Sequence, residues 1–231
     1  MNERPILYSA PMARARNAGI KRMTRRVIKL PSWIPDPDAA IYHLREQCAV
    51  GKHAGLALFD DGRPVKRFTC PFGGPGDRLR GKENAWVWCR KERDGDTKTG
   101  RPKYNYIPVG KHVVYQAECP KKPTLWRDEN PAHDWRLKIG RYLPAWASRI
   151  LDEITEVRVE RVQAISEEDA RAEGIEPLPD ASFRGPPSAE GCTVYVTARA
   201  AFRALWIHIN GQESWDRNDW CWVISFKPVS P

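Results

Sequence analysis

The stretch from Ile150 to Val162 is the feature that most constrains the fold. Apolar residues alternate there with glutamates and arginines over most of its length. Successive side chains of a strand point to opposite faces, so such alternation is typical of a long, curved strand with one buried face. We predict that strand in a small mixed or antiparallel barrel, paired with a closing strand from Trp220 to Phe226.

The remaining patterns predict more strands than helices. Helices are expected where a start signal and a glycine stop bracket an amphipathic run, as between Ser166 and Gly174. Further helices are expected at 11–18, 38–47 and 197–209. Further strands are expected at 6–8, 24–30, 79–88 (interrupted near Gly81) and 111–116. This order predicts an α+β fold, a small β-barrel decorated by helices.

We predict a single domain over residues 1–231. Irregular or turn-rich sequence fills long insertions at about 31–75, 90–145 and 176–192. Residues 91–103 predict the tip of a hairpin, and 119–142 predict irregular structure. The proline-rich insertion at 176–192 predicts a loop, with a lid as one interpretation.

Charge indicates a polyanionic partner. The chain has 38 Lys and Arg against 29 Asp and Glu, and the first 30 residues hold eight basic side chains against one acid. RNA or DNA fits this balance, although a merely solvated basic surface fits it too. No stretch approaches the roughly 20 apolar residues of a membrane span, and the N-terminus lacks a signal-peptide core. We expect a cytoplasmic protein without a membrane partner.

Cysteine and histidine spacing predicts neither a metal site nor a cofactor. The six cysteines form no CxxC pair, and the five histidines are isolated. A zinc site needs clustered ligands, so we expect buried or incidental thiols.

The segment from Gly19 to Arg26 holds the candidate chemistry. Lys21 is a potential base and Thr24 a potential nucleophile, beside candidate phosphate contacts at Arg22, Arg25 and Arg26. Lys21 and Thr24 would be neighbours on a turn but would face opposite sides of a strand. A shared role therefore predicts a turn at this point.

The pattern Gly19-x-Lys21-x-x-Thr24-x-Arg26 resembles the signature of ASCH domains, which are PUA-like β-barrels. ASCH domains usually carry Glu at the position of Thr24, and the Thr version is similar to the small bacterial N4-acetylcytidine amidohydrolases. Residues 75–79, 154–175 and 222–227 resemble further segments of that family in the same order. The chain also resembles the longer ASCH proteins of tailed phages over most of its length, including 144–150 and 166–174.

The resemblance implies an amidohydrolase that acts on N4-acylated cytidine or a related modified nucleoside or base. Its catalytic Lys, Thr and Glu fall on Lys21, Thr24 and Glu173, the last through the alignment of residues 165–173. The chain departs from the phage pattern at 80–86, which makes Glu83 a second candidate acid. Trp86 is a candidate for stacking on a base or for packing in the core.

Two proton assignments stay open at this point. Lys21 can act as the base if its pKa falls well below about 10.4, which burial and neighbouring arginines favour and Glu173 opposes. Alternatively, a charged Lys21 stabilises the oxyanion and Glu173 is the base. Arg26, at the family's Arg position, is expected to point inward and hold a carboxylate or substrate.

Three functions remain in competition. The first is the amidohydrolase, and the second is a module that binds RNA or modified DNA through a basic cleft without chemistry. The third is a ribonuclease, which would favour a metal or a His-based acid–base pair. The sequence does not address the oligomeric state.

Overall fold

The computed structural model describes residues 1–29, 55–60, 63–124, 130–188 and 191–229. They form an α+β fold in which strands predominate over helices. None of the helices in these ranges is long and apolar enough to cross a membrane. The helix expected at 38–47 lies outside the described residues.

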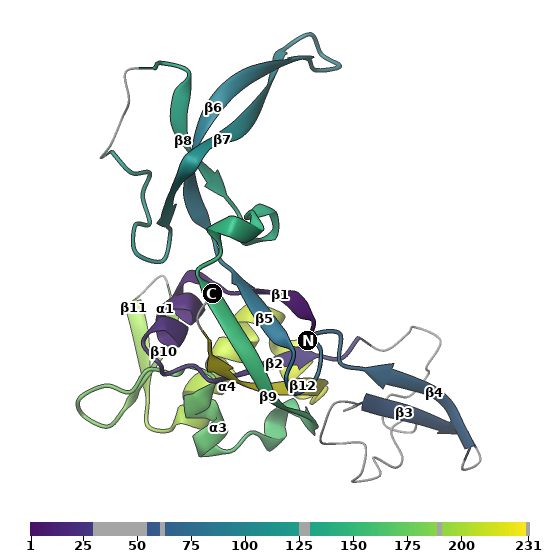
Figure 1. The fold of residues 1–231 in the computed structure, drawn as a ribbon. Helices are drawn as coiled ribbons and strands as arrows, with labels where there is room; N and C mark the ends of the chain where they lie inside the picture. Colours follow the sequence, from purple (N-terminus) through teal and green to yellow (C-terminus); the bar gives the residue numbers. More distant parts are fainter. Residues whose placement is uncertain (30–54, 61–62, 125–129, 189–190, 230–231) are drawn as a thin grey trace. The chain divides into compact units, whose positions relative to one another are not determined.

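The largest sheet has five strands in the order β1-β5-β9-β12-β2 (Figure 1). These are β1 (Glu3–Leu7), β5 (Arg78–Lys82), β9 (Ile150–Arg161), β12 (Trp220–Pro228) and β2 (Met23–Val27). β12 runs antiparallel to both β9 and β2. The long strand and its pairing with the closing strand are therefore confirmed. The strands within the described ranges form no closed barrel.

The chain divides into two compact units. The first comprises Met1–Arg4, Ala15–Leu79 and Leu151–Ser230, and the second comprises Pro5–Arg14 and Arg80–Ile150. Each unit is described by itself. A single domain with insertions stays a prediction.

Three of the four α-helices in the described ranges lie where the sequence predicts them, and α5 (Gln212–Asp216) was not predicted. The other three are α1 (Ala10–Asn17), α3 (Glu167–Ala172) and α4 (Ala198–Asn210). Ser166 caps α3 by accepting from the Asp169 amide at 3.0 Å, and Thr197 caps α4 by accepting from the Ala200 amide at 3.2 Å. Such caps satisfy amides that have no partner inside the helix.

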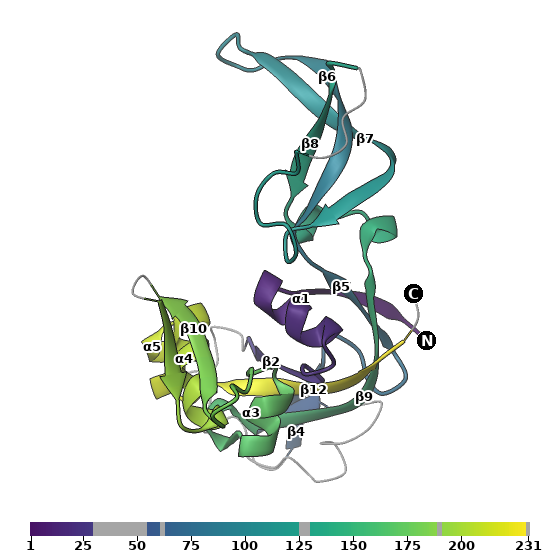
Figure 2. The same ribbon diagram turned by 90° about the vertical axis from the view of Figure 1, so that its left-hand side faces the viewer.

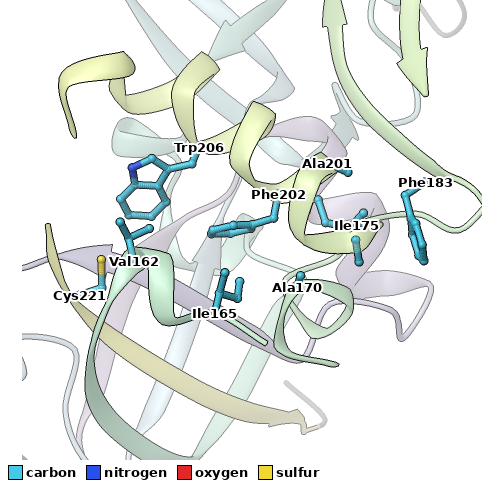
Figure 3. Packing of buried hydrophobic residues seen from close by; sticks show 10 residues of the cluster. Val162, Ile165, Ala170, Ile175, Phe183, Ala201, Phe202, Trp206 and Cys221 are labelled. Carbon is cyan, nitrogen blue, oxygen red and sulfur yellow. The ribbon is translucent and has the colours of Figure 1, made fainter. Parts of the chain in front are cut away.

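The apolar stripe of α4 packs in the core of the first unit. Figure 3 shows Phe202 and Trp206 of α4 directed towards Ile165 and Val162, which follow β9. Phe202 and Trp206 are 3% and 5% exposed. This packing holds α3 and its C-terminal residues in place beside β12, because α3 contributes Ala170 to the same cluster.

The second unit contains a three-stranded sheet in the order β7-β6-β8. Its strands are β6 (Ala85–Asp96), β7 (Pro102–Tyr115) and β8 (His133–Lys138). The hairpin tip predicted at 91–103 is confirmed but shorter, because the strands continue to Asp96 and resume at Pro102. The expected strand at 79–88 breaks between Lys82 and Ala85 instead of near Gly81. β8 lies in the segment expected to be irregular.

The loop predicted at 176–192 is wrong in part. Phe183–Ser188 forms β10, which lies beside α4 in Figure 2 and pairs with β11 (Gly191–Tyr195). Prolines indicated a loop, yet a proline is tolerated in an edge strand or at an irregularity, and the register shifts between Arg184 and Pro187. A second hairpin, β3 (Gly55–Asp60) and β4 (Arg63–Thr69), falls in the insertion at 31–75.

Candidate active site

The prediction of a turn that makes Lys21 and Thr24 neighbours is wrong: the turn follows α1 at Ala18 and Gly19, before Lys21, and Thr24 lies on β2. α1 ends, and the amides of Ile20 and Lys21 both donate to the Ala15 carbonyl, at 2.9 and 3.0 Å. Lys21 therefore lies in the connection that precedes β2, not on the strand itself. The next amide, that of Arg22, donates to the Ala172 carbonyl at 2.8 Å and ties this connection to α3.

Glu173 is presented by the C-terminal end of α3. Its amide donates to the Asp169 carbonyl at 2.9 Å, so its backbone continues the last turn of the helix. Gly174 follows with a φ of +98°, a conformation that residues with a β-carbon rarely adopt. The chain thus reverses directly after Glu173.

Lys21 and Glu173 form a buried ion pair. Lys21 Nζ donates to Glu173 Oε2 at 2.8 Å and to the Glu173 carbonyl oxygen at 2.7 Å. The two side chains are 0% and 6% exposed. Within the described ranges, Glu173 Oε1 has no hydrogen-bond partner, and the Arg25 guanidinium lies 3.7 Å away. The pair therefore retains an acceptor that is not satisfied.

The pKa of Lys21 lies below its ordinary value. Burial is the largest cause because it disfavours the charged ammonium, and the charges of Arg26 and Arg25 act in the same direction. The charge of Glu173 and its hydrogen bond to Nζ oppose the shift. The net direction is the one that a basic role for Lys21 requires.

Arg25 forms ion pairs with carboxylates around this site. Its side chain is 0% exposed, and Nη2 donates to Asp169 Oδ2 at 2.7 Å and to Glu160 Oε2 at 3.0 Å. Arg158 contacts the same two carboxylates at 3.1 and 2.9 Å. We expected Arg25 among the phosphate contacts, but in the structure its guanidinium is engaged by protein carboxylates and holds the surroundings of Glu173.

Thr24 and Arg26 lie on β2. Thr24 pairs with Ile224 of β12 and is 2% exposed, and Arg26 pairs with Trp222 and is half-buried. Strand alternation puts both on the face opposite Arg25. Among the described residues, no hydrogen bond joins Thr24 to Lys21 or Glu173. The structure thus brings Lys21 and Glu173 into contact and places Thr24 buried on the adjoining strand.

The other candidates have different surroundings. Arg22 is exposed, and its Nε donates to the Gly19 carbonyl at 3.1 Å. Glu83 belongs to the second unit and is 2% exposed, with Arg149 Nε donating to it at 2.8 Å. Trp86 is half-buried in the same unit and donates from its indole to the Cys119 carbonyl at 3.2 Å. Of the two candidate acids, Glu173 is the one bonded to Lys21.

No group of three or more His, Cys, Asp or Glu side chains within the described ranges is placed to hold a metal ion. Comparisons with models of protein families, with curated proteins and with solved structures found no match.

Replacing Gly174 by Ala is expected to disturb Lys21. A β-carbon there would lie 3.0 Å from the β-carbon of Lys21 and 3.1 Å from that of Ala15, in addition to the strain of a φ of +98°. We expect a loss of about 2–3 kcal/mol of unfolding free energy. Urea denaturation measures it.

Gly19→Ala is the matched control for this prediction. Gly19 also has a positive φ, +74°, but a β-carbon there would meet nothing within 4 Å. Backbone strain alone then costs about 1–2 kcal/mol. Equal losses in the two variants would contradict a tight contact between Gly174 and Lys21.

Proposed function

We propose that this chain is an ASCH-type amidohydrolase, with a PUA-like fold, that removes the acyl group from N4-acylated cytidine or a related modified nucleoside in the cytoplasm. The observation that carries the proposal is the buried Lys21–Glu173 pair with one unsatisfied carboxylate oxygen. Buried titratable pairs with a shifted pKa are concentrated at functional sites. The resemblance of the segment from Gly19 to Arg26 to the amidohydrolase signature supports the substrate class.

We assign the third hydrogen-bond direction of Lys21 Nζ to the chemistry. An ammonium has three donors, and Glu173 accepts two of them through Oε2 and its carbonyl oxygen. If the amine is neutral, its two N–H groups fill the same positions and its lone pair takes the third. The third direction therefore carries either a base or a donor for an oxyanion.

The reaction then follows from these groups. The Thr24 hydroxyl, or a water that it holds, adds to the acyl carbonyl carbon while its proton passes to the Lys21–Glu173 pair. The carbon–nitrogen bond breaks as the pair returns that proton to N4, which releases cytidine. If Thr24 is the nucleophile, water hydrolyses the resulting ester and releases the acid.

Binding without turnover is the second candidate. The net charge of +9 favours it, because a basic protein attracts nucleic acid whether or not chemistry follows. In that case Lys21 and Thr24 contact the ligand, and their replacement weakens binding only.

Incubation with N4-acetylcytidine tests the proposal. We expect the purified chain to release more than one mole of cytidine per mole of protein. Chromatography measures the cytidine released. A folded protein that binds the nucleoside but releases no cytidine would reject the hydrolase in favour of the binding module. Cleavage of an RNA oligonucleotide in the same assay would instead favour a ribonuclease.

Replacing Thr24 by Val is expected to slow cytidine release at least about tenfold. Valine keeps the shape of this buried residue but removes the hydroxyl that attacks or orients water. Thr24→Ser restores the hydroxyl and should retain most of the activity, measured as kcat/KM. Full activity in Thr24→Val would remove Thr24 from the mechanism.

A further inference from the structure

The two faces of the β7-β6-β8 sheet differ in character. Directly paired residues lie on the same face of a sheet, and Lys91 pairs with Tyr106 while Arg93 pairs with Tyr104. On the other side of β6, Arg136 and Lys138 of β8 pair with residues of the same face. We call this the tyrosine face, and it is defined by Lys91, Arg93, Tyr104, Tyr106, Arg136 and Lys138.

Unbalanced positive charge lies on the tyrosine face. Its four cations stand against one carboxylate, Asp134, which Lys122 contacts at 2.7 Å and Arg136 at 3.9 Å. Arg93 also contacts Asp96 near the hairpin tip, at 3.0 Å. On the opposite face of the hairpin, Arg90 forms an ion pair with Glu92, and Lys103 forms one with Asp94. The cations are therefore concentrated on one side of the hairpin.

Cations hold both tyrosine rings. Lys91 Nζ lies 3.8 Å from the centroid of the Tyr104 ring, and Arg136 Cζ lies 3.8 Å from that of Tyr106. Tyr104 is 38% exposed, whereas Tyr106 packs partly against the buried cluster that includes Val87. These contacts fix the rings before any ligand arrives, which lowers the entropic cost of binding.

We propose that the tyrosine face binds single-stranded nucleic acid. Single strands are held by aromatic or guanidinium planes that stack on bases and by cations that contact phosphates, and this face combines Tyr104 and Arg136 with Lys91. A membrane surface would need apolar side chains where this face has charges. The inference goes beyond the proposed function and stands on the second unit alone.

Fluorescence anisotropy of a labelled oligouridylate of about 12 nucleotides tests this site. We expect salt-dependent binding by the full chain. Lys91→Ala should weaken it and reduce the slope of log affinity against log salt by about 0.7, the value for one phosphate contact with a single strand. Arg90→Ala is the matched control, because Arg90 is the next residue on the opposite face and should leave affinity and slope unchanged.

Tyr104→Ala tests stacking separately from charge. Loss of one stacked base should weaken binding at least about fivefold with little change in salt slope. Equal effects of Lys91→Ala and Arg90→Ala, or no binding by the wild type, would overturn the proposal. A matched oligodeoxyuridylate distinguishes RNA from DNA.

This test is separable from that of the hydrolase. Free N4-acetylcytidine is a single nucleoside and not a polynucleotide. The Lys91→Ala variant should therefore hydrolyse it at the wild-type rate. Oligonucleotide binding that depends on Lys91 in a protein without turnover would reject the hydrolase and keep the tyrosine face. Turnover of N4-acetylcytidine without Lys91-dependent oligonucleotide binding would support the hydrolase and reject the binding site on the tyrosine face.

Discussion

Lys21→Met is expected to reduce the turnover of N4-acetylcytidine on the order of 10²- to 10⁴-fold, the usual contribution of a positioned acid–base group. Methionine retains a long, unbranched side chain, which suits a position that is fully buried. It removes both hydrogen bonds to Glu173 and the group in the third direction of Nζ. Comparison of kcat and KM for both proteins separates lost chemistry from lost binding.

The pH dependence of the wild type assigns the role of Lys21. Its pKa is lowered, so the neutral amine is present at lower pH than for an ordinary lysine. If Lys21 is the base, kcat/KM rises with pH through that pKa and levels off below the ordinary value of about 10.4. If the ammonium stabilises the oxyanion, kcat/KM falls over the same interval. We expect the rise, because a lowered pKa favours the neutral amine that a base requires.

The fold of Lys21→Met needs its own control, because the variant leaves the Glu173 carboxylate buried without its partner. The double variant Lys21→Met, Glu173→Gln removes the uncompensated charge and should recover much of the lost stability. It should remain without turnover. Substantial turnover in a folded double variant would show that the pair is not the catalytic group.

Much of the first unit was predictable because its signals are local. The alternation from Ile150 predicts β9, and the cap at Ser166 with the stop at Gly174 predicts α3. The apolar residues of α4 recur at helical spacing and so lie on one side of the helix, which predicts that this side is buried. These elements follow from residues a few positions apart.

The hairpins of the insertions were harder to predict. β7 continues from Pro102 to Tyr115 although it carries prolines and a glycine. β10 includes two prolines and pairs with β11 through an irregular register. Proline and glycine are read as breakers, but pairing with a distant strand overrides that local preference.

The candidate site likewise has features that the sequence indicated and features that only the fold determines. The contact between Lys21 and Glu173 spans 152 positions, and only the family resemblance indicated it. The arrangement around Arg25 was missed, because a basic cluster does not show which member is turned inward. Strand alternation in β2 was the available signal: it separates Arg25 from its neighbour Arg26, but the partners on α3 and β9 come from the fold.

Arg25→Met is expected to lower the unfolding free energy by about 3 kcal/mol. Removing one partner of a buried ion pair leaves the other charge uncompensated, which costs about 3–5 kcal/mol. Arg25 is fully buried and serves Glu160, Asp169 and Glu173. The lower end applies because Glu160 and Asp169 keep some solvent exposure and their contacts with Arg158. Urea denaturation at constant pH measures the difference.

Two further variants serve as controls for Arg25→Met. Arg22→Met removes an exposed arginine from the same segment and should change stability by no more than about 0.5 kcal/mol. Arg25→Lys keeps the charge but lacks the planar donors that reach several carboxylates together, so an intermediate loss is expected. Because Arg25 also faces Glu173 Oε1, both Arg25 variants should shift the pH profile of cytidine release, whereas Arg22→Met should not. A loss below about 1 kcal/mol in Arg25→Met would mean that the carboxylates do not depend on this guanidinium.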